Sequence, residues 1–166
     1  SSSAASDVYK RQPTLHNPTG AVLSESRRRA LADLARRADL LVVEDDVHRL
    51  LTPDAPPPVA ALAPERAIHL AGVSKVLAGG LRVAFLTAPS EASARLARAV
   101  WATSWMAPPL VAELATRWIR DGTLARTAAA KRREARRRQE LARRVLGPGA
   151  DGAHPDAYHL WLSLPA

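Results

Sequence analysis

The chain has 166 residues, enough for one domain with a sizeable core, and 47% of them are apolar, as in a globular protein. It contains no cysteine, which excludes disulfides, thiolate catalysis and cysteine-based metal sites, and we expect no metal site. No run of 18 uncharged apolar residues occurs, so we expect no transmembrane helix. No signal peptide heads the sequence, and the lack of cysteine is compatible with the cytoplasmic location that we expect.

The formal net charge of +8 is concentrated in one segment. Residues 124–146 contain nine Lys or Arg and two Glu, a local charge of +7, which leaves +1 for the rest of the chain. Such a segment could contact the phosphates of a nucleic acid. No aromatic residues interleave with the basic ones, however, and charge runs usually form a solvated helix face. The pattern therefore favours a solvated helix over a nucleic-acid-binding arm.

The amino-terminal part of the chain divides into a prefix, a loop and a helix. Residues 1–12 are Ser-rich and lack periodicity, so we interpret them as a non-native or disordered prefix outside the fold. Residues 13–20 contain the turn formers Asn-Pro and Thr-Gly and predict a loop. Ser24 is a suitable N-cap for a helix over residues 24–38, which carries Leu and Ala on one face.

Three short apolar runs predict buried strands. Residues 40–43 read Leu-Leu-Val-Val, too short for a helix and typical of a buried parallel strand. Acidic residues 44–46 follow at once, at the edge of the sheet where α/β folds place their sites. A Pro-rich loop over residues 52–58 comes next, and residues 68–71 and 83–86 are the other two predicted strands.

The second half of the chain is predominantly helical. Helices are predicted over residues 90–103, from Pro109 to about 121, and over 123–146, where Gly-Pro-Gly ends the last one. Residues 159–164 predict a strand that opens a second unit. Strands that alternate with helices indicate an α/β fold with a parallel sheet.

The loop between the last two strands of the sheet holds one lysine, Lys75. The chain uses 21 arginines and only three lysines. Because a guanidinium stays protonated, it is a poor amine nucleophile, so a lysine in this loop suggests amine chemistry such as a Schiff base. An ordinary surface lysine is the alternative interpretation.

Four features occur in a defined order along the chain: Asn17 in Asn-Pro-Thr-Gly, Asp45 after a strand, Lys75 in Val-Ser-Lys and Arg82 in Gly-Gly-Leu-Arg. Together they resemble the fold-type-I pyridoxal-phosphate enzymes, the class I/II aminotransferases, over residues 13–166. Each motif alone is weak, and the specificity lies in their combination.

The resemblance implies a fold and an activity. It implies a partial three-layer, parallel-sheet large domain over residues 13–146 and the start of a small α+β carboxyl-terminal domain over 147–166. It further implies a homodimer that binds pyridoxal 5'-phosphate and transfers an amino group between an amino acid and a 2-oxo acid.

The resemblance also assigns roles to individual side chains. Lys75 would form the Schiff base with the cofactor and move the α-proton of the substrate. Asp45 would keep the ring nitrogen of the cofactor protonated, and Asn17 would donate to its phenolate oxygen. Arg82 would bind the phosphate group, and Ser74 would add a hydroxyl donor to it.

The chain departs from the family pattern at three positions. His48 stands where the family usually has a tyrosine that donates to the phenolate oxygen, and an imidazole can donate there with a charge that depends on pH. Gly72 stands where many members have a phosphate-binding serine, which removes one donor. Ala84 stands where a glycine is common.

A second functional hypothesis is a regulator. The family's phosphate loop and substrate-binding arginine fall outside residues 13–166, so we expect the chain to be the middle of a larger protein. Residues 44–51, 71–82 and 104–110 resemble the effector domains of GntR/MocR-type transcription regulators, which would sense the cofactor with little or no turnover. Such a protein would bind DNA only through a winged-helix domain outside this chain.

Overall fold

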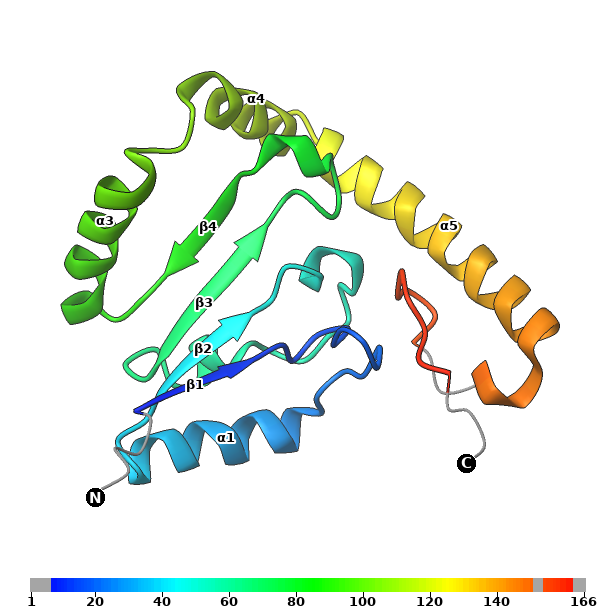
Figure 1. Ribbon diagram of the computed structural model, residues 1–166, viewed down its shortest axis with the longest axis horizontal. Helices are drawn as coiled ribbons and strands as arrows, with labels where there is room; N and C mark the ends of the chain where they lie inside the picture. The colour runs from blue at the N-terminus through cyan, green and yellow to red at the C-terminus, as the bar shows by residue number, and fades with distance from the viewer. Residues whose placement is uncertain (1–6, 151–153, 163–166) are drawn as a thin grey trace.

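A four-stranded sheet in the order β1-β2-β3-β4 forms the centre of the computed structural model, which describes residues 7–150 and 154–162 (Figure 1). Strands β1 to β3 pair in parallel and β4 pairs antiparallel with β3. The strands are β1 (Val8–Arg11), β2 (Leu41–Asp45), β3 (Ala67–Gly72) and β4 (Ala84–Thr87). The α/β class and the parallel-dominated sheet predicted from the sequence are therefore confirmed.

Strand β4 runs antiparallel to its neighbour, whereas we expected all strands of the sheet to be parallel. A parallel neighbour needs a crossover of a dozen or more residues, usually a helix. The connection between β3 and β4 holds only a short 3-10 turn, Gly79–Leu81, so the chain turns back beside β3. The register runs from His69 opposite Thr87 to Gly72 opposite Ala84.

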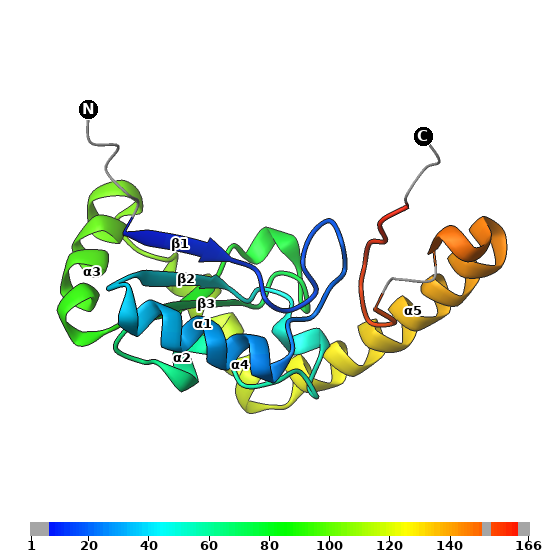
Figure 2. The same ribbon diagram turned by 90° about the horizontal axis from the view of Figure 1, so that it is seen from below.

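Helices α1 (Glu25–Arg37) and α2 (Val59–Leu62) lie together on one face of the sheet (Figure 2). Ser24 caps α1 as predicted, with its hydroxyl accepting from the Arg27 amide. The core beneath these helices consists of small and β-branched side chains: Ala32, Ala35, Val42, Val59, Ala63 and Ala67. The sheet and the helices α1 and α2 thus form two layers. The expected architecture has a third layer, which the described residues do not contain.

The three long helices follow the sheet in chain order as predicted: α3 (Ser90–Ser104), α4 (Pro109–Arg120) and α5 (Thr123–Leu146). The buried positions of α5 are Ala128, Ala135 and Gln139, and its basic residues are exposed or half-exposed, as expected of a solvated face. None of the helices described here is long and apolar enough to span a membrane.

Two terminal segments differ from the sequence-based expectation. Residues 1–12 were expected outside the fold, yet Val8–Arg11 form β1, because Val and Tyr favour strands and β2 offers an unpaired edge there. Residues 159–162 have no regular structure, since no described strand pairs with them, and the rest of the predicted strand, residues 163–166, lies outside the described residues.

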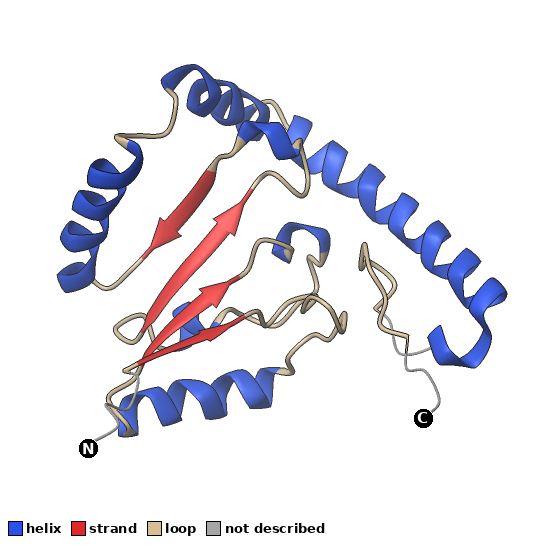
Figure 3. Ribbon diagram, in the orientation of Figure 1, coloured by secondary structure: helices blue, strands red, loops and turns tan. Residues whose placement is uncertain are grey.

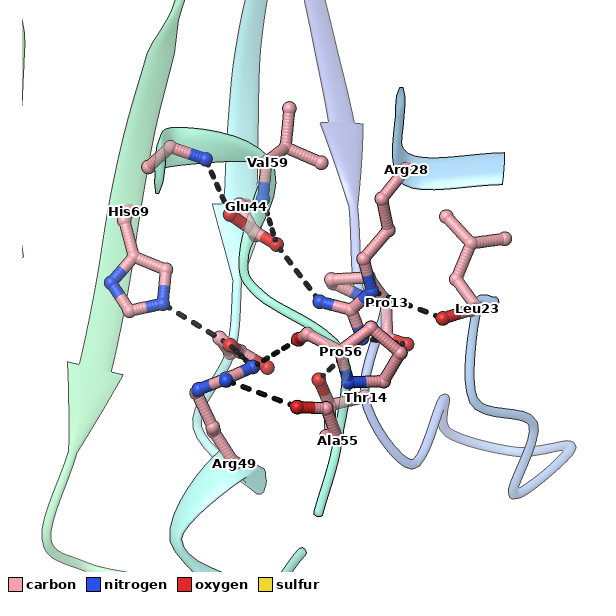
Figure 4. A network of polar contacts seen from close by, with 12 residues as sticks. Pro13, Thr14, Leu23, Arg28, Glu44, Arg49, Ala55, Pro56, Val59 and His69 are labelled. Atoms are coloured by element: carbon pink, nitrogen blue, oxygen red, sulfur yellow. Dashed lines mark hydrogen bonds and ion pairs between the residues drawn. The ribbon is translucent and has the colours of Figure 1, made fainter. Parts of the chain in front are cut away.

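A fully buried ion pair joins α1 to the sheet (Figure 4). The side chains of Arg28 and Glu44 are both 0% exposed, with Nη1 and Oε1 3.5 Å apart. The Arg28 guanidinium donates further bonds of 3.0–3.1 Å to the backbone carbonyls of Leu23 and Pro13 and to the Thr14 hydroxyl. The cation therefore ties the loop before α1 to β2.

Glu44 is held from the other side by the start of α2. Its two carboxylate oxygens accept from the amides of Val59 and Ala60 at 3.0 and 3.2 Å. These are unpaired donors at a helix amino terminus, where a carboxylate is favourable. Burial nevertheless raises the pKa of Glu44, and the two amides oppose that rise. The carboxylate depends on its partners to stay charged.

We predict that Arg28→Met lowers the free energy of unfolding by about 3–5 kcal/mol, because it leaves a buried carboxylate without its cation. Urea denaturation followed by circular dichroism measures this. The matched control is Arg29→Met on the same helix, which removes an exposed pair with Glu25 and should cost about 0.5 kcal/mol. Equal losses in the two variants would contradict a central role for the buried pair.

Candidate functional site

A cavity of about 390 Å³ lies at the carboxyl ends of the parallel strands β2 and β3. Figure 3 shows both strands passing into loops at this edge of the sheet. Three of the predicted site residues, Ser74, Lys75 and Arg82, line it together. The rest of the lining is small or apolar: Val47, Gly72, Gly79, Val83 and Ala84. The structure thus brings together the lysine, the hydroxyl and the arginine that the sequence singled out.

The loop that carries Lys75 is shaped by its apolar neighbours. Val73 and Val76 are 1% and 0% exposed, and they pack into two separate clusters of the core. Burial of these two side chains turns Lys75 outward, where it is exposed at the cavity. An amine that keeps contact with solvent remains accessible to a ligand aldehyde.

Arg82 has an unusual backbone conformation. Its φ of 52° and ψ of 35° lie in the left-handed region, which costs a non-glycine residue roughly 1–2 kcal/mol. A strained arginine beside a cavity motivates a functional hypothesis. Its planar fork of donors suits a phosphate group.

Gly72 leaves room for the serine that many family members have. A Cβ built there would meet Val47 Cγ1 at 3.7 Å, an ordinary contact. Space therefore does not explain the missing hydroxyl, and the cavity has one donor fewer than the family pattern.

Asp45 ends β2 and faces away from the buried network of Glu44. One carboxylate oxygen, Oδ2, lies 3.4 Å from the Lys10 ammonium. The other, Oδ1, is buried and has no hydrogen-bond partner. A buried acceptor without a donor is costly. The open oxygen fits a ligand that brings an N–H, such as a protonated ring nitrogen.

His48 is buried and neutral. The ring lies 5.9 Å from the ring of His159, and its Nδ1 is buried without a partner. Burial, followed by the electrostatic effects of Lys75 and His159, lowers the pKa of His48 to about 4, against the opposing effect of Asp45 and Asp46. At neutral pH His48 can therefore donate from one nitrogen without carrying a charge.

Asn17 is exposed and does not line the cavity. Its backbone amide donates to Gln12 Oε1 at 2.7 Å, and the loop is further held by His159 Nε2, which donates to the His16 carbonyl at 3.0 Å. Asn17, like Asp45 and His48, is not among the residues that line this cavity.

The sequence analysis did not identify Asp46 and the residues that contact it. Asp46 is buried and contacts His69 at 3.1 Å and Arg49 at 3.5 Å. Burial opposes its ionisation, but the hydrogen bonds from His69 and Thr14 and the charge of Arg49 hold the pKa of Asp46 below its usual value. Apart from the alternation of side chains along a strand, nothing in the sequence distinguishes Asp46 from Asp45.

Comparison with known proteins gives a consistent family. The sequence profile of the family "Aminotransferase class I and II" matches residues 12–151. The chain is 34% identical over 154 residues to the uncharacterized HTH-type transcriptional regulator YdeF of Bacillus subtilis, covering 92% of this chain and 33% of that protein. It is 33% identical over 119 residues to the mitochondrial kynurenine/alpha-aminoadipate aminotransferase of Bos taurus, covering 68% and 28%.

The fold is similar to that of a solved aminotransferase. The structure of Pyrococcus horikoshii kynurenine aminotransferase in complex with PMP matches with a TM-score of 0.79 and 26% identity, over 86% of this chain and 36% of that one. The chain thus spans about a third of the length of the relatives that it matches.

We predict that His48 makes the fold sensitive to acid. Between pH 6.5 and about 4, the unfolded His48 binds a proton that the folded state excludes, so the free energy of unfolding falls as the pH falls. The loss is about 3 kcal/mol over this window. Denaturation of the wild type and of His48→Phe across this range measures it, and the variant should lose less. Parallel pH profiles would contradict the assignment.

Proposed function

The chain belongs to the class I and II aminotransferase family, and from that premise we propose that it is a pyridoxal-phosphate-binding aminotransferase domain in which Lys75 carries the cofactor. The observation that carries this proposal is the convergence of Ser74, Lys75 and Arg82 on one cavity at the carboxyl ends of β2 and β3. Asp45, which ends β2, adds a buried carboxylate oxygen without a hydrogen-bond partner. The residues present fit the cofactor, because they offer an amine, phosphate donors and a ring-nitrogen acceptor.

When bound, pyridoxal phosphate supplies an aldehyde that condenses with amines and a ring that withdraws electrons from the substrate's α-carbon. Lys75 would hold the cofactor aldehyde through its amine. Once the amine of an amino acid displaced it there, the freed Lys75 nitrogen would take and return the α-proton of the substrate. Arg82 and Ser74 would hold the phosphate group as hydrogen-bond donors. Asp45 would accept a hydrogen bond from the ring nitrogen, and a carboxylate there would keep that nitrogen protonated.

His48 replaces the usual tyrosine donor with a neutral imidazole. Its pKa of about 4 means that it stays uncharged across the physiological range, so it donates a hydrogen bond without adding a cation beside Lys75. In the complete protein we propose that these residues transfer an amino group between an amino acid and a 2-oxo acid, within a homodimer.

A second candidate function is a cofactor-sensing effector domain of a GntR/MocR-type regulator. The similarity to the regulator YdeF extends over 92% of the chain, whereas that to the bovine aminotransferase covers 68%. The absent hydroxyl at Gly72 also suits a site that binds the cofactor without rapid turnover. In this case DNA would be bound by a domain outside this chain.

Reduction with borohydride tests the cofactor assignment. The full-length protein incubated with pyridoxal phosphate should yield an irreversible adduct on the peptide that contains Lys75, identified by mass spectrometry. The chain has two other lysines, Lys10 and Lys131, which serve as internal controls and should remain largely unmodified. An equal yield of adduct in Lys75→Ala would sink the proposal.

A half-reaction separates the two functions. The loaded full-length protein is incubated with a panel of amino acids, and the release of a 2-oxo acid is measured. We expect release with at least one amino acid for an aminotransferase. Retention of the adduct on Lys75 with no oxo acid from any amino acid would favour the effector domain.

A further inference from the structure

The backbone of Lys75 is held by residues far away in the sequence. The Tyr158 hydroxyl donates to the Lys75 carbonyl at 3.0 Å. Lys131, on α5, donates through its ammonium to the Leu77 carbonyl at 3.0 Å and to the Lys75 carbonyl at 3.4 Å. Two carbonyls of one short loop therefore depend on α5 and on the segment that follows it.

The loop has little support of its own. Its first turn is closed by the amides of Val76 and Leu77, which both donate to the Val73 carbonyl. Beyond that turn Gly79 and Gly80 are exposed, and a Cβ built at either would meet nothing within 4 Å. The half of the loop that leads to Arg82 is thus open on its outer side.

The same two elements also pack against the loop. Val76 is fully buried in a cluster with Ala128 of α5 and Ala157, together with Leu15 and Leu51. Apolar contact at Val76 lies between the two carbonyls that accept hydrogen bonds, at Lys75 and Leu77. Lys75, Val76 and Leu77 are therefore all held by α5 and the segment that follows it. The Lys75 side chain faces the cavity.

Residues 154–160 are in turn anchored to α5. The Gln139 amide, on a side chain 4% exposed, donates to the carbonyls of Ala157 and His159 at 2.8 and 3.1 Å. Arg136 forms an ion pair of 2.6 Å with Asp156, whose side chain is 5% exposed. Figure 1 shows the segment lying between α5 and the loops that follow β1 and β2. Helix and segment therefore act on the Lys75 loop as one unit.

We propose that Lys131 and Tyr158 are positioning residues for Lys75, an inference that rests on the function proposed for Lys75. By holding the carbonyls of Lys75 and Leu77, they fix the backbone position of Lys75 and the direction in which its side chain extends to the cavity. His159 extends the effect, because it donates to His16 and lies against the ring of His48. Residues 154–160 therefore connect the loops that follow β1, β2 and β3.

Two measurements on the full-length protein test this, with Tyr158→Phe and Lys131→Met as the variants. The first is hydrogen exchange of the Val76 and Leu77 amides without cofactor. Exchange should become about fivefold faster in either variant, because Tyr158→Phe removes one hydrogen bond that holds this turn and Lys131→Met removes two. The second is the rate of borohydride-trapped attachment of pyridoxal phosphate to Lys75, which should fall about tenfold because the amine is misplaced.

Control variants separate positioning from general loss of structure. Lys131→Arg keeps a donor cation and should restore most of the trapping rate. Arg133→Met removes an exposed cation from the same helix and should match the wild type in both measurements. The inference is overturned if Lys131→Met and Tyr158→Phe both match Arg133→Met. If the wild type gives no adduct on Lys75, the proposed function fails, and the exchange rates still decide whether these residues hold the loop.

Discussion

The buried ion pair between Arg28 and Glu44 determines where the carboxyl end of β2 lies, and the site residues that follow depend on it. Successive side chains of a strand point to opposite faces of the sheet. Because Glu44 points to the face that α1 covers, Asp45 points to the other face. Glu44 is satisfied by a guanidinium and two amides. Asp45 keeps one buried oxygen without a donor. The strand thus separates a structural carboxylate from one that has a single oxygen without a partner.

The lysine loop is constrained by a different mechanism. Apolar burial of Val73 and Val76 orients it, and hydrogen bonds from Lys131 and Tyr158 hold it. None of these contacts involves the Lys75 side chain, which leaves the amine available for chemistry. The residues that lead into the cavity are therefore held in two places, at β2 by the buried network of Glu44 and at the Lys75 loop by α5 with its following segment.

The elements of the fold were predictable because hydrophobic periodicity and helix caps are local signals. Ser24, the Leu-Leu-Val-Val run and the Gly-Pro-Gly stop placed their elements within a few residues of their observed ends. The direction of β4 was not predictable, since an apolar run carries no information on which way it pairs. Strand β1 was missed because its Ser-rich surroundings obscured four residues that pair with β2.

The site was predictable in part, for related reasons. Ser74, Lys75 and Arg82 lie close in sequence and share one cavity, whereas the exposed side chain of Asn17 lies outside it. Lys131 acts on a residue 56 positions away, which no local pattern reveals. One clue was present, because the scarcity of lysine among many arginines marks Lys131 as much as Lys75.

The most direct test of this account is the protonation state that Asp45 imposes on a bound cofactor. Nitrogen-15 NMR of the full-length protein, loaded with pyridoxal phosphate labelled in its ring, measures it at neutral pH. We predict a protonated ring nitrogen in the wild type and an unprotonated one in Asp45→Asn, with Asp39→Asn unchanged as the control. A ring nitrogen in the same state in all three proteins would contradict the assignment of Asp45 and of the site around it.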